Sequence, residues 1–141
     1  MLLCLPTAMG GYALPKPTLN PEVTLDANAR ALYPHLVARP DLFWEEKRLD
    51  VEYDGDAHEG GESRAKDAGR LAALEVEGIT VVTLTYPQVA SALAFDVVAR
   101  RIGRMLGAPV RIRMKNDGHA RRRLLLREEL GLMPDGPSLL W

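Results

Sequence analysis

Hydrophobic and polar side chains alternate with a period of two in the middle of the chain, which predicts a pair of β-strands. The stretches "HLVARPDLFW" (residues 35–44) and "RLDVEYDG" (residues 48–55) are joined by a short polar turn. The second strand places apolar side chains on one face and acids on the other: Leu49, Val51 and Tyr53 against Asp50, Glu52 and Asp54. The spacing therefore predicts a hairpin with an acidic face.

The periodicity becomes helical after this hairpin. Ser63 is a typical N-cap, and the helical pattern runs to about Glu77 and closes at Gly78. Residues 79–85 are apolar on both faces and β-branched, as in a buried central strand. A second helix is expected over residues 87–107. The order of strand, strand, helix, strand and helix predicts an α/β fold with a mixed sheet core flanked by helices.

The two ends of the chain are less regular. Asp26 is expected to cap a short helix that ends before Pro34. Residues 110–114 suggest a last strand and residues 120–131 a short basic helix. We therefore expect a core domain over residues 1–108 and a basic C-terminal extension over residues 109–141.

Composition narrows the class of protein. The chain has 141 residues, of which 47% are hydrophobic and 26% charged, as in a globular domain. A single cysteine excludes an internal disulfide framework and fits a reducing cytoplasm. No apolar run reaches the roughly 18 residues of a membrane span, so we expect a cytoplasmic protein without a membrane partner.

Charge is unevenly distributed along the chain. Residues 1–95 contain 8 Lys and Arg against 14 Asp and Glu, whereas residues 96–141 contain 10 against 5. An acidic centre beside a basic end suits a metal-dependent enzyme that acts on a polyanion. A solvated helix face would produce the same asymmetry, so charge alone does not decide between the two.

The acidic strand acquires a further carboxylate if the hairpin has the expected register. A turn over residues 45–48 pairs Trp44 with Leu49 and places Asp41 opposite Glu52, whereas a slip by one residue puts Asp41 on the apolar side. Two ionised carboxylates about 5 Å apart repel each other by roughly 3 kcal/mol at an effective dielectric constant near 20. Solvent, protonation, basic neighbours or a bound cation must offset this repulsion.

A divalent cation is one way to offset it. Carboxylate oxygens suit Mg²⁺ or Mn²⁺, and His58 follows the strand closely enough to reach the same space. The spacing does not match a calcium-binding EF-hand loop, and three scattered histidines with one cysteine make a structural zinc site improbable. The alternative is an exposed acidic strand face with His58 in an ordinary loop.

The segments "PDLFWEEKRLDVEYDGDAH" and "AKDAGRLAALEVEGITVVTLT" together resemble the very-short-patch-repair endonuclease-like branch of the PD-(D/E)XK nuclease superfamily. The resemblance covers most of residues 1–106. The matching residues run from the first acidic strand to the central strand: Asp41, Glu52, Asp54, Gly55, His58, Asp67, Arg70, Gly78 and Ile79.

The resemblance implies a restriction-endonuclease-like fold and Mg²⁺-dependent hydrolysis of DNA. Asp41, Glu52 and the backbone of Tyr53 would then hold the metal. Asp54 and His58 would position or deprotonate the attacking water. The metal would lower the pKa of that water and neutralise charge on the phosphate.

Two departures from the superfamily pattern keep an alternative open. Asp54 stands where the superfamily commonly has a lysine, and residues 1–21 contain no Asp or Glu to supply the acid of an N-terminal helix. We therefore expect a truncated or degenerate member. The alternative functions are a catalytically inactive nuclease fold that binds DNA or a protein partner, and a small α/β protein with a fortuitously acidic strand.

Candidate DNA contacts lie on two helical segments. Asp67 and Arg70 are three residues apart on one helical face, where they either orient the site and touch the phosphate backbone or form a surface ion pair worth under about 1 kcal/mol. Arg100 and Arg104 belong to the basic part of the chain and are candidate phosphate contacts. For each arginine, exposure to solvent without a partner is the competing interpretation.

Overall fold

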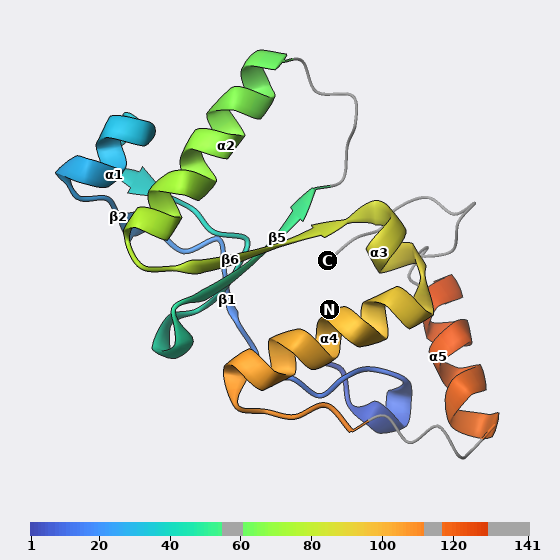
Figure 1. The fold of residues 1–141 in the computed structure, drawn as a ribbon. Coiled ribbons are helices and arrows are strands. Elements are labelled where there is room, and N and C mark those ends of the chain that lie inside the picture. Colours follow the sequence, from blue (N-terminus) through green and yellow to red (C-terminus); the bar gives the residue numbers. More distant parts are fainter. Residues whose placement is uncertain (55–60, 112–116, 130–141) are drawn as a thin grey trace. The chain divides into compact units, whose positions relative to one another are not determined.

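The computed structural model describes residues 1–54, 61–111 and 117–129 (Figure 1). Over these residues the fold is mixed α/β, with a four-stranded mixed sheet and a separate two-stranded sheet, which confirms the predicted class. The chain divides into two compact units. One is Pro17–Tyr86, and the other joins Met1–Lys16 to Pro87–Trp141.

The main sheet lies in the Pro17–Tyr86 unit and has the order β1-β4-β5-β6. Its strands are β1 (Thr18–Leu19), β4 (Leu42–Trp44), β5 (Leu49–Asp54) and β6 (Thr80–Thr85). The β1–β4 and β4–β5 pairs are antiparallel and the β5–β6 pair is parallel. The turn between β4 and β5 is the short 3-10 helix η2 (Glu45–Lys47), which ends at Arg48 with φ 47°. The helix α2 (Gly61–Val76) provides the crossover that a parallel pair requires.

The predicted strand over residues 35–44 is two short strands. Its first part, β3 (Val37–Ala38), pairs with β2 (Val23–Thr24) in the small sheet, and only its second part, β4, joins the main sheet. Pro40 separates the two parts, and a proline has no N–H with which to continue a ladder. Between β2 and β3 lies α1 (Ala27–Leu32), whose Asp26 side chain accepts the predicted N-cap bond from Ala29 N at 2.8 Å.

The two helices of this unit cover one face of the main sheet. Figure 1 shows α1 beside α2, and Gly69 of α2 makes this approach possible, because a Cβ there would lie 2.8 Å from Leu32 O. Beneath them is an apolar cluster that takes residues from α1, α2 and the strands: Leu25, Ala29, Ala38, Phe43, Ala73, Leu74 and Ile79. Phe43 is the cross-strand partner of Asp50. The acidic face of β5 is therefore the face that α2 covers.

The second unit is mainly helical in the described residues. It contains η1 (Thr7–Met9), α4 (Ala92–Leu106) and α5 (Asp117–Glu129), and the short α3 (Tyr86–Ala90) leads into it. The predicted helix over residues 87–107 is interrupted at Ser91, whose hydroxyl accepts a bond from Ala94 N at 3.2 Å and caps α4. The basic helix predicted over residues 120–131 corresponds to α5.

Candidate functional site

The hairpin brings the predicted acids together. Trp44 pairs with Leu49 and Leu42 with Val51, as the sequence predicts, and Asp41 directly precedes the first residue of β4. The backbone N–H of Tyr53 donates to Asp41 Oδ2 at 3.2 Å, which fixes the Asp41 side chain beside β5. Asp41, just before β4, therefore lies close enough to Glu52 on β5 for the two acids to interact.

These acids are not on an open surface. Asp50 is 0% exposed and Glu52 4% exposed, whereas Asp41 is half-buried. Because the face carrying Asp50 and Glu52 is turned toward α2, both side chains are removed from water. We call Asp41, Asp50 and Glu52 the carboxylate cluster. Its burial contradicts the alternative of an exposed acidic strand face.

Arg70 of α2 supplies the cluster with a positive charge. Its Nη1 donates to Glu52 Oε1 at 2.7 Å and its Nη2 to Glu52 Oε2 at 2.8 Å, a bidentate pair. The remaining N–H groups are also engaged, with Arg39 O at 2.9 Å and with Asp67 Oδ1 at 2.7 and 3.1 Å. Every N–H of the guanidinium thus has an acceptor. Arg70 can contact a phosphate only if it releases one of them.

The surroundings of Glu52 keep it ionised. Burial raises the pKa of Glu52, but the hydrogen bonds from Arg70 and from Asp50 outweigh burial and hold this pKa below its ordinary value. The same contacts with Glu52, opposed by burial, raise the pKa of Arg70. Glu52 and Arg70 therefore form a buried ion pair, with side chains 5% and 18% exposed.

The surroundings of Asp50 disfavour its charged form. Neither of its carboxyl oxygens has a hydrogen-bond partner of standard geometry among the residues that the structure describes. Burial, then hydrogen bonding to Glu52 and the negative charges of Glu52 and Asp41, raise its pKa to about 9. A pKa in this range favours the protonated form of Asp50 at neutral pH, and in that form the carboxyl can donate a hydrogen bond to Glu52.

Two features of the described residues reduce the repulsion within the cluster. The guanidinium of Arg70 supplies a positive charge beside Glu52, and the raised pKa of Asp50 favours its neutral form. Burial and the nearby Glu52 charge also raise the pKa of Asp41, which favours the neutral form of that acid as well. Among the described residues, no group of three or more His, Cys, Asp or Glu side chains is arranged to hold a metal ion. A cation at Glu52 would compete with Arg70 for the same oxygens.

The remaining predicted side chains that the structure describes are exposed. Asp54 is exposed at the end of β5, and His58 lies outside the described residues. Asp67 is 55% exposed and pairs with Arg70. Arg100 and Arg104 are exposed on α4, in the other unit.

Sequence reasoning missed Asp50 as a member of the site. A signal was present, because Asp50 is two residues before Glu52 on the same strand face. The aromatic Phe43 opposite Asp50 indicated that this face is covered. The pairing of Arg70 with Glu52 was also missed, since no local pattern connects residues that are 18 positions apart.

Comparisons with protein-family models, curated proteins and solved structures found no match to this chain. Within the described residues, no helix is both long enough and apolar enough to cross a membrane.

Proposed function

We propose that the Pro17–Tyr86 unit is a nuclease-type domain that hydrolyses DNA phosphodiester bonds with Mg²⁺ or Mn²⁺. The observation that supports this proposal most is the position of Asp41, which the hydrogen bond from Tyr53 N holds beside β5 and near Glu52. The pattern shared with the very-short-patch-repair endonuclease-like branch requires these two acids at one place. Membership of that branch is part of the proposal.

The donor chemistry around Asp41 fits a hydrated Mg²⁺ ion. Such an ion commonly takes one or two carboxylates and keeps several waters. Asp41 engages one oxygen with Tyr53 N, and its half-buried position leaves it accessible to solvent on one side. Exposed Asp54 lies on the same face of β5. Glu52 could bind an ion only if Arg70 released one of its oxygens.

Each acid near the ion would then have a distinct role. Bound Mg²⁺ would neutralise charge on the phosphate and acidify a coordinated water. Asp41 would hold the ion, and Glu52 would share its charge between the ion and Arg70. Asp54, at the open end of the strand, would accept a proton from the attacking water. Burial under α2 would keep Asp50 and Glu52 in one arrangement throughout.

A second candidate function is a non-catalytic nuclease fold that binds DNA or a protein partner. The bidentate Arg70–Glu52 pair favours it, because that pair neutralises the acid that a metal would use. The acidic character of the unit also matters: Pro17–Tyr86 holds 7 Lys and Arg against 14 Asp and Glu. A cation or the basic unit would have to offset its repulsion of DNA.

Asp41→Asn is expected to abolish Mg²⁺-dependent nicking of supercoiled plasmid by the full chain. The amide keeps an acceptor for Tyr53 N but removes the negative charge that holds the ion. Millimolar Mg²⁺ or Mn²⁺ is expected to raise the melting temperature of the wild type and to leave that of the variant unchanged. Gel assays of nicking and thermal melts measure both effects.

Glu46→Gln is the matched control, since Glu46 is an exposed acid in η2 outside the cluster. It should nick plasmid and respond to Mg²⁺ like the wild type. Nicking that persists in Asp41→Asn would contradict the assigned site. Salt-dependent DNA binding with neither nicking nor a Mg²⁺ response would replace the first candidate by the second.

A further inference from the structure

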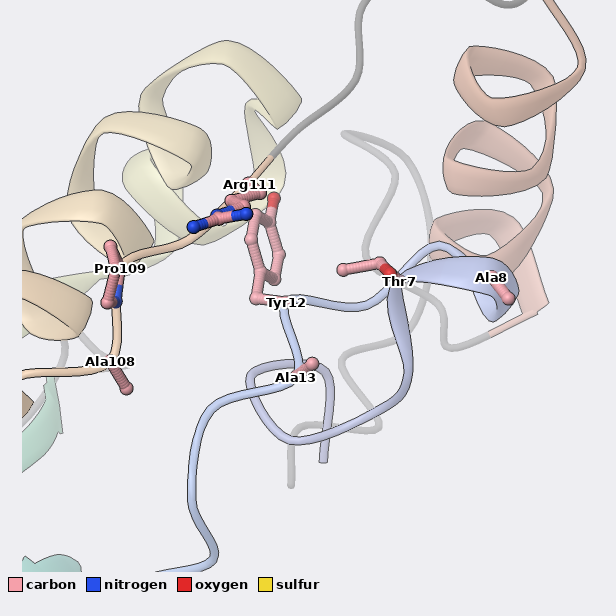
Figure 2. A pocket seen from close by; sticks show the side chains of 7 residues that line it. All are labelled: Thr7, Ala8, Tyr12, Ala13, Ala108, Pro109 and Arg111. Atoms are coloured by element: carbon pink, nitrogen blue, oxygen red, sulfur yellow. The ribbon is translucent and has the colours of Figure 1, made fainter.

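The unit that joins Met1–Lys16 to Pro87–Trp141 contains an open cavity of about 600 Å³. This volume lies within the range of small-molecule sites, roughly 300–1,000 Å³. Figure 2 shows the ring of Tyr12 standing between Thr7 and Arg111. Two segments far apart in the sequence form the walls: Thr7, Ala8, Tyr12, Ala13, Ala108, Pro109 and Arg111.

The lining of the cavity selects for an anion with an apolar body. Among the described residues that line it, Arg111 is the only charged one and none is an acid. Thr7 adds a hydroxyl, and most of the remaining wall is alanine and proline. Small-molecule sites typically combine an apolar lining with a few polar groups that orient the ligand. A guanidinium suits a carboxylate or a phosphate, which it can bind with two hydrogen bonds.

The wall formed by Tyr12 is backed by a buried polar network. Tyr12 is 3% exposed, and its hydroxyl donates to Asp96 Oδ1 at 2.6 Å and accepts from Arg123 Nη2 at 3.0 Å. Arg123 also forms an ion pair with Asp96. The one buried acid of this network is therefore already neutralised by an arginine. It leaves no negative charge to repel an anion in the cavity.

Arg127 adds a positive charge that nothing in the described residues neutralises. It is 2% exposed, it lies over the ring of Phe95 at 5.5 Å, and its Nε, Nη1 and Nη2 have no hydrogen-bond partner there. Burial, with a contribution from nearby Arg123, lowers the pKa of Arg127. A buried cation without a counter-charge is costly. An anion bound nearby would reduce this cost.

The unit that contains the cavity also carries a net positive charge. Met1–Lys16 and Pro87–Trp141 together hold 11 Lys and Arg against 5 Asp and Glu. A surplus of this size raises the local concentration of anions at a concave site. The cavity therefore lies where both local and unit-wide charge favour a negative ligand.

The backbone of the cavity wall is tightly held. Ala13 has φ 52°, a left-handed conformation that is unfavourable for a residue with a side chain. Its N–H donates to Leu5 O at 2.8 Å, and Leu14 N donates to Leu3 O at 2.9 Å. Backbone strain of this kind persists only where the surrounding structure enforces it, and it concentrates at binding sites. The wall is thus preformed for a ligand.

We propose that this cavity binds a small molecule that carries an oxyanion, phosphate or carboxylate, on an apolar body. Arg111 binds the oxyanion, and Ala8, Ala13 and Pro109 contact the body of the ligand. The charge of Arg127, whose guanidinium has no hydrogen-bond partner among the described residues, favours the anionic form. This site is independent of the carboxylate cluster and of the proposed nuclease activity.

Phenyl phosphate, benzoate, inorganic phosphate and neutral phenol are suitable probes for calorimetric titration of the full chain. We expect phenyl phosphate or benzoate to bind, inorganic phosphate to bind more weakly, and phenol not to bind. The ranking of the first two identifies which oxyanion is preferred. Arg111→Gln should weaken binding of the preferred probe by about tenfold or more, as expected when a charge-assisted bond is lost.

Two pairs of variants make the test specific. Ala8→Glu should abolish binding by placing a negative charge on the wall, whereas Ala8→Gln should weaken it much less. Arg122→Gln, which removes an exposed arginine of α5 outside the cavity, should change nothing. Equal binding by Arg111→Gln and the wild type would overturn the proposal. So would equal affinity for phenol and phenyl phosphate, or no binding of either anionic aromatic probe at millimolar concentration.

Discussion

Replacing Arg70 by alanine is expected to lower the free energy of unfolding by about 3 to 5 kcal/mol. The change leaves the Glu52 carboxylate, only 5% exposed, without the two hydrogen bonds at 2.7 and 2.8 Å that neutralise it. Asp50 would then be the main remaining donor to a buried charge. Urea denaturation of the wild type and the variant at pH 7 measures the difference.

The neighbouring ion pair provides the control. Asp67→Ala removes a 55% exposed partner of the same arginine and should cost under about 1 kcal/mol. The double variant Arg70→Leu with Glu52→Leu should regain most of the stability, because apolar residues can replace a buried ion pair. A cost below about 1 kcal/mol for Arg70→Ala would show that Glu52 is not held by Arg70 in solution.

This experiment also bears on the proposed function. If Arg70 stabilises Glu52 strongly, a divalent ion at Glu52 must displace or share that interaction, and its affinity decreases accordingly. If the stabilisation is weak, Glu52 is available to a cation. A large loss of stability in Arg70→Ala therefore predicts a small Mg²⁺-induced rise in the melting temperature of the wild type, and a small loss predicts a larger rise.

The parts of the fold that follow from local pattern were predictable. Alternation along residues 48–55 predicts β5, and the position of the polar turn predicts the pairing of Trp44 with Leu49. The apolar run after Gly78 predicts β6, but the expectation of a buried central strand is wrong for the described sheet, where β6 lies at the end of the strand order and has exposed positions. In each case the side-chain period determines which residues share a face, so the approach of Asp41 to Glu52 follows from the sequence.

The environment of those acids was not predictable from period alone. A strand with one acidic face is usually solvated there, and although Phe43 opposite Asp50 indicates a covered face, nothing local identifies α2 as the cover. The cover depends on Phe43 and Ile79, which contact α1 and α2 residues on the same side as Asp50. Burial raises the pKa of Asp50 and so favours its neutral form, whereas Glu52 pairs with Arg70.

The division of the chain into units also lay beyond sequence reasoning. The first sixteen residues, through Lys16, belong with the helical part that begins at Pro87, although the Pro17–Tyr86 unit separates them in the sequence. Close backbone approach makes this possible, since a Cβ at Gly10 would lie 3.0 Å from Arg123 Cα. Such long-range contacts leave no periodic signal.

The largest pH effect on stability is expected from Asp50. Its pKa rises from 3.8 to about 9 on folding, so over this pH range the folded protein holds a proton that the unfolded chain has released. The contribution of the Asp50 proton to the free energy of unfolding is therefore fully present below pH 3.8 and is lost progressively as the pH rises toward 9. Each pH unit can cost up to about 1.4 kcal/mol. The lowered pKa of Glu52 acts in the opposite direction only in the acid range, where it loses its charge.

Asp50→Asn isolates this effect, because the amide still donates a hydrogen bond to Glu52 but does not titrate. Relative to the wild type, the variant should gain about 2 to 4 kcal/mol between pH 5 and pH 8. Denaturant unfolding at several pH values measures the gain, and Glu46→Gln, at an exposed position, should follow the wild type. Parallel pH profiles for Asp50→Asn and the wild type would mean that Asp50 is ionised in the folded protein. An ionised Asp50 would add a negative charge to the carboxylate cluster, and a cation besides Arg70 would be needed to balance it. That result would support the metal-dependent function.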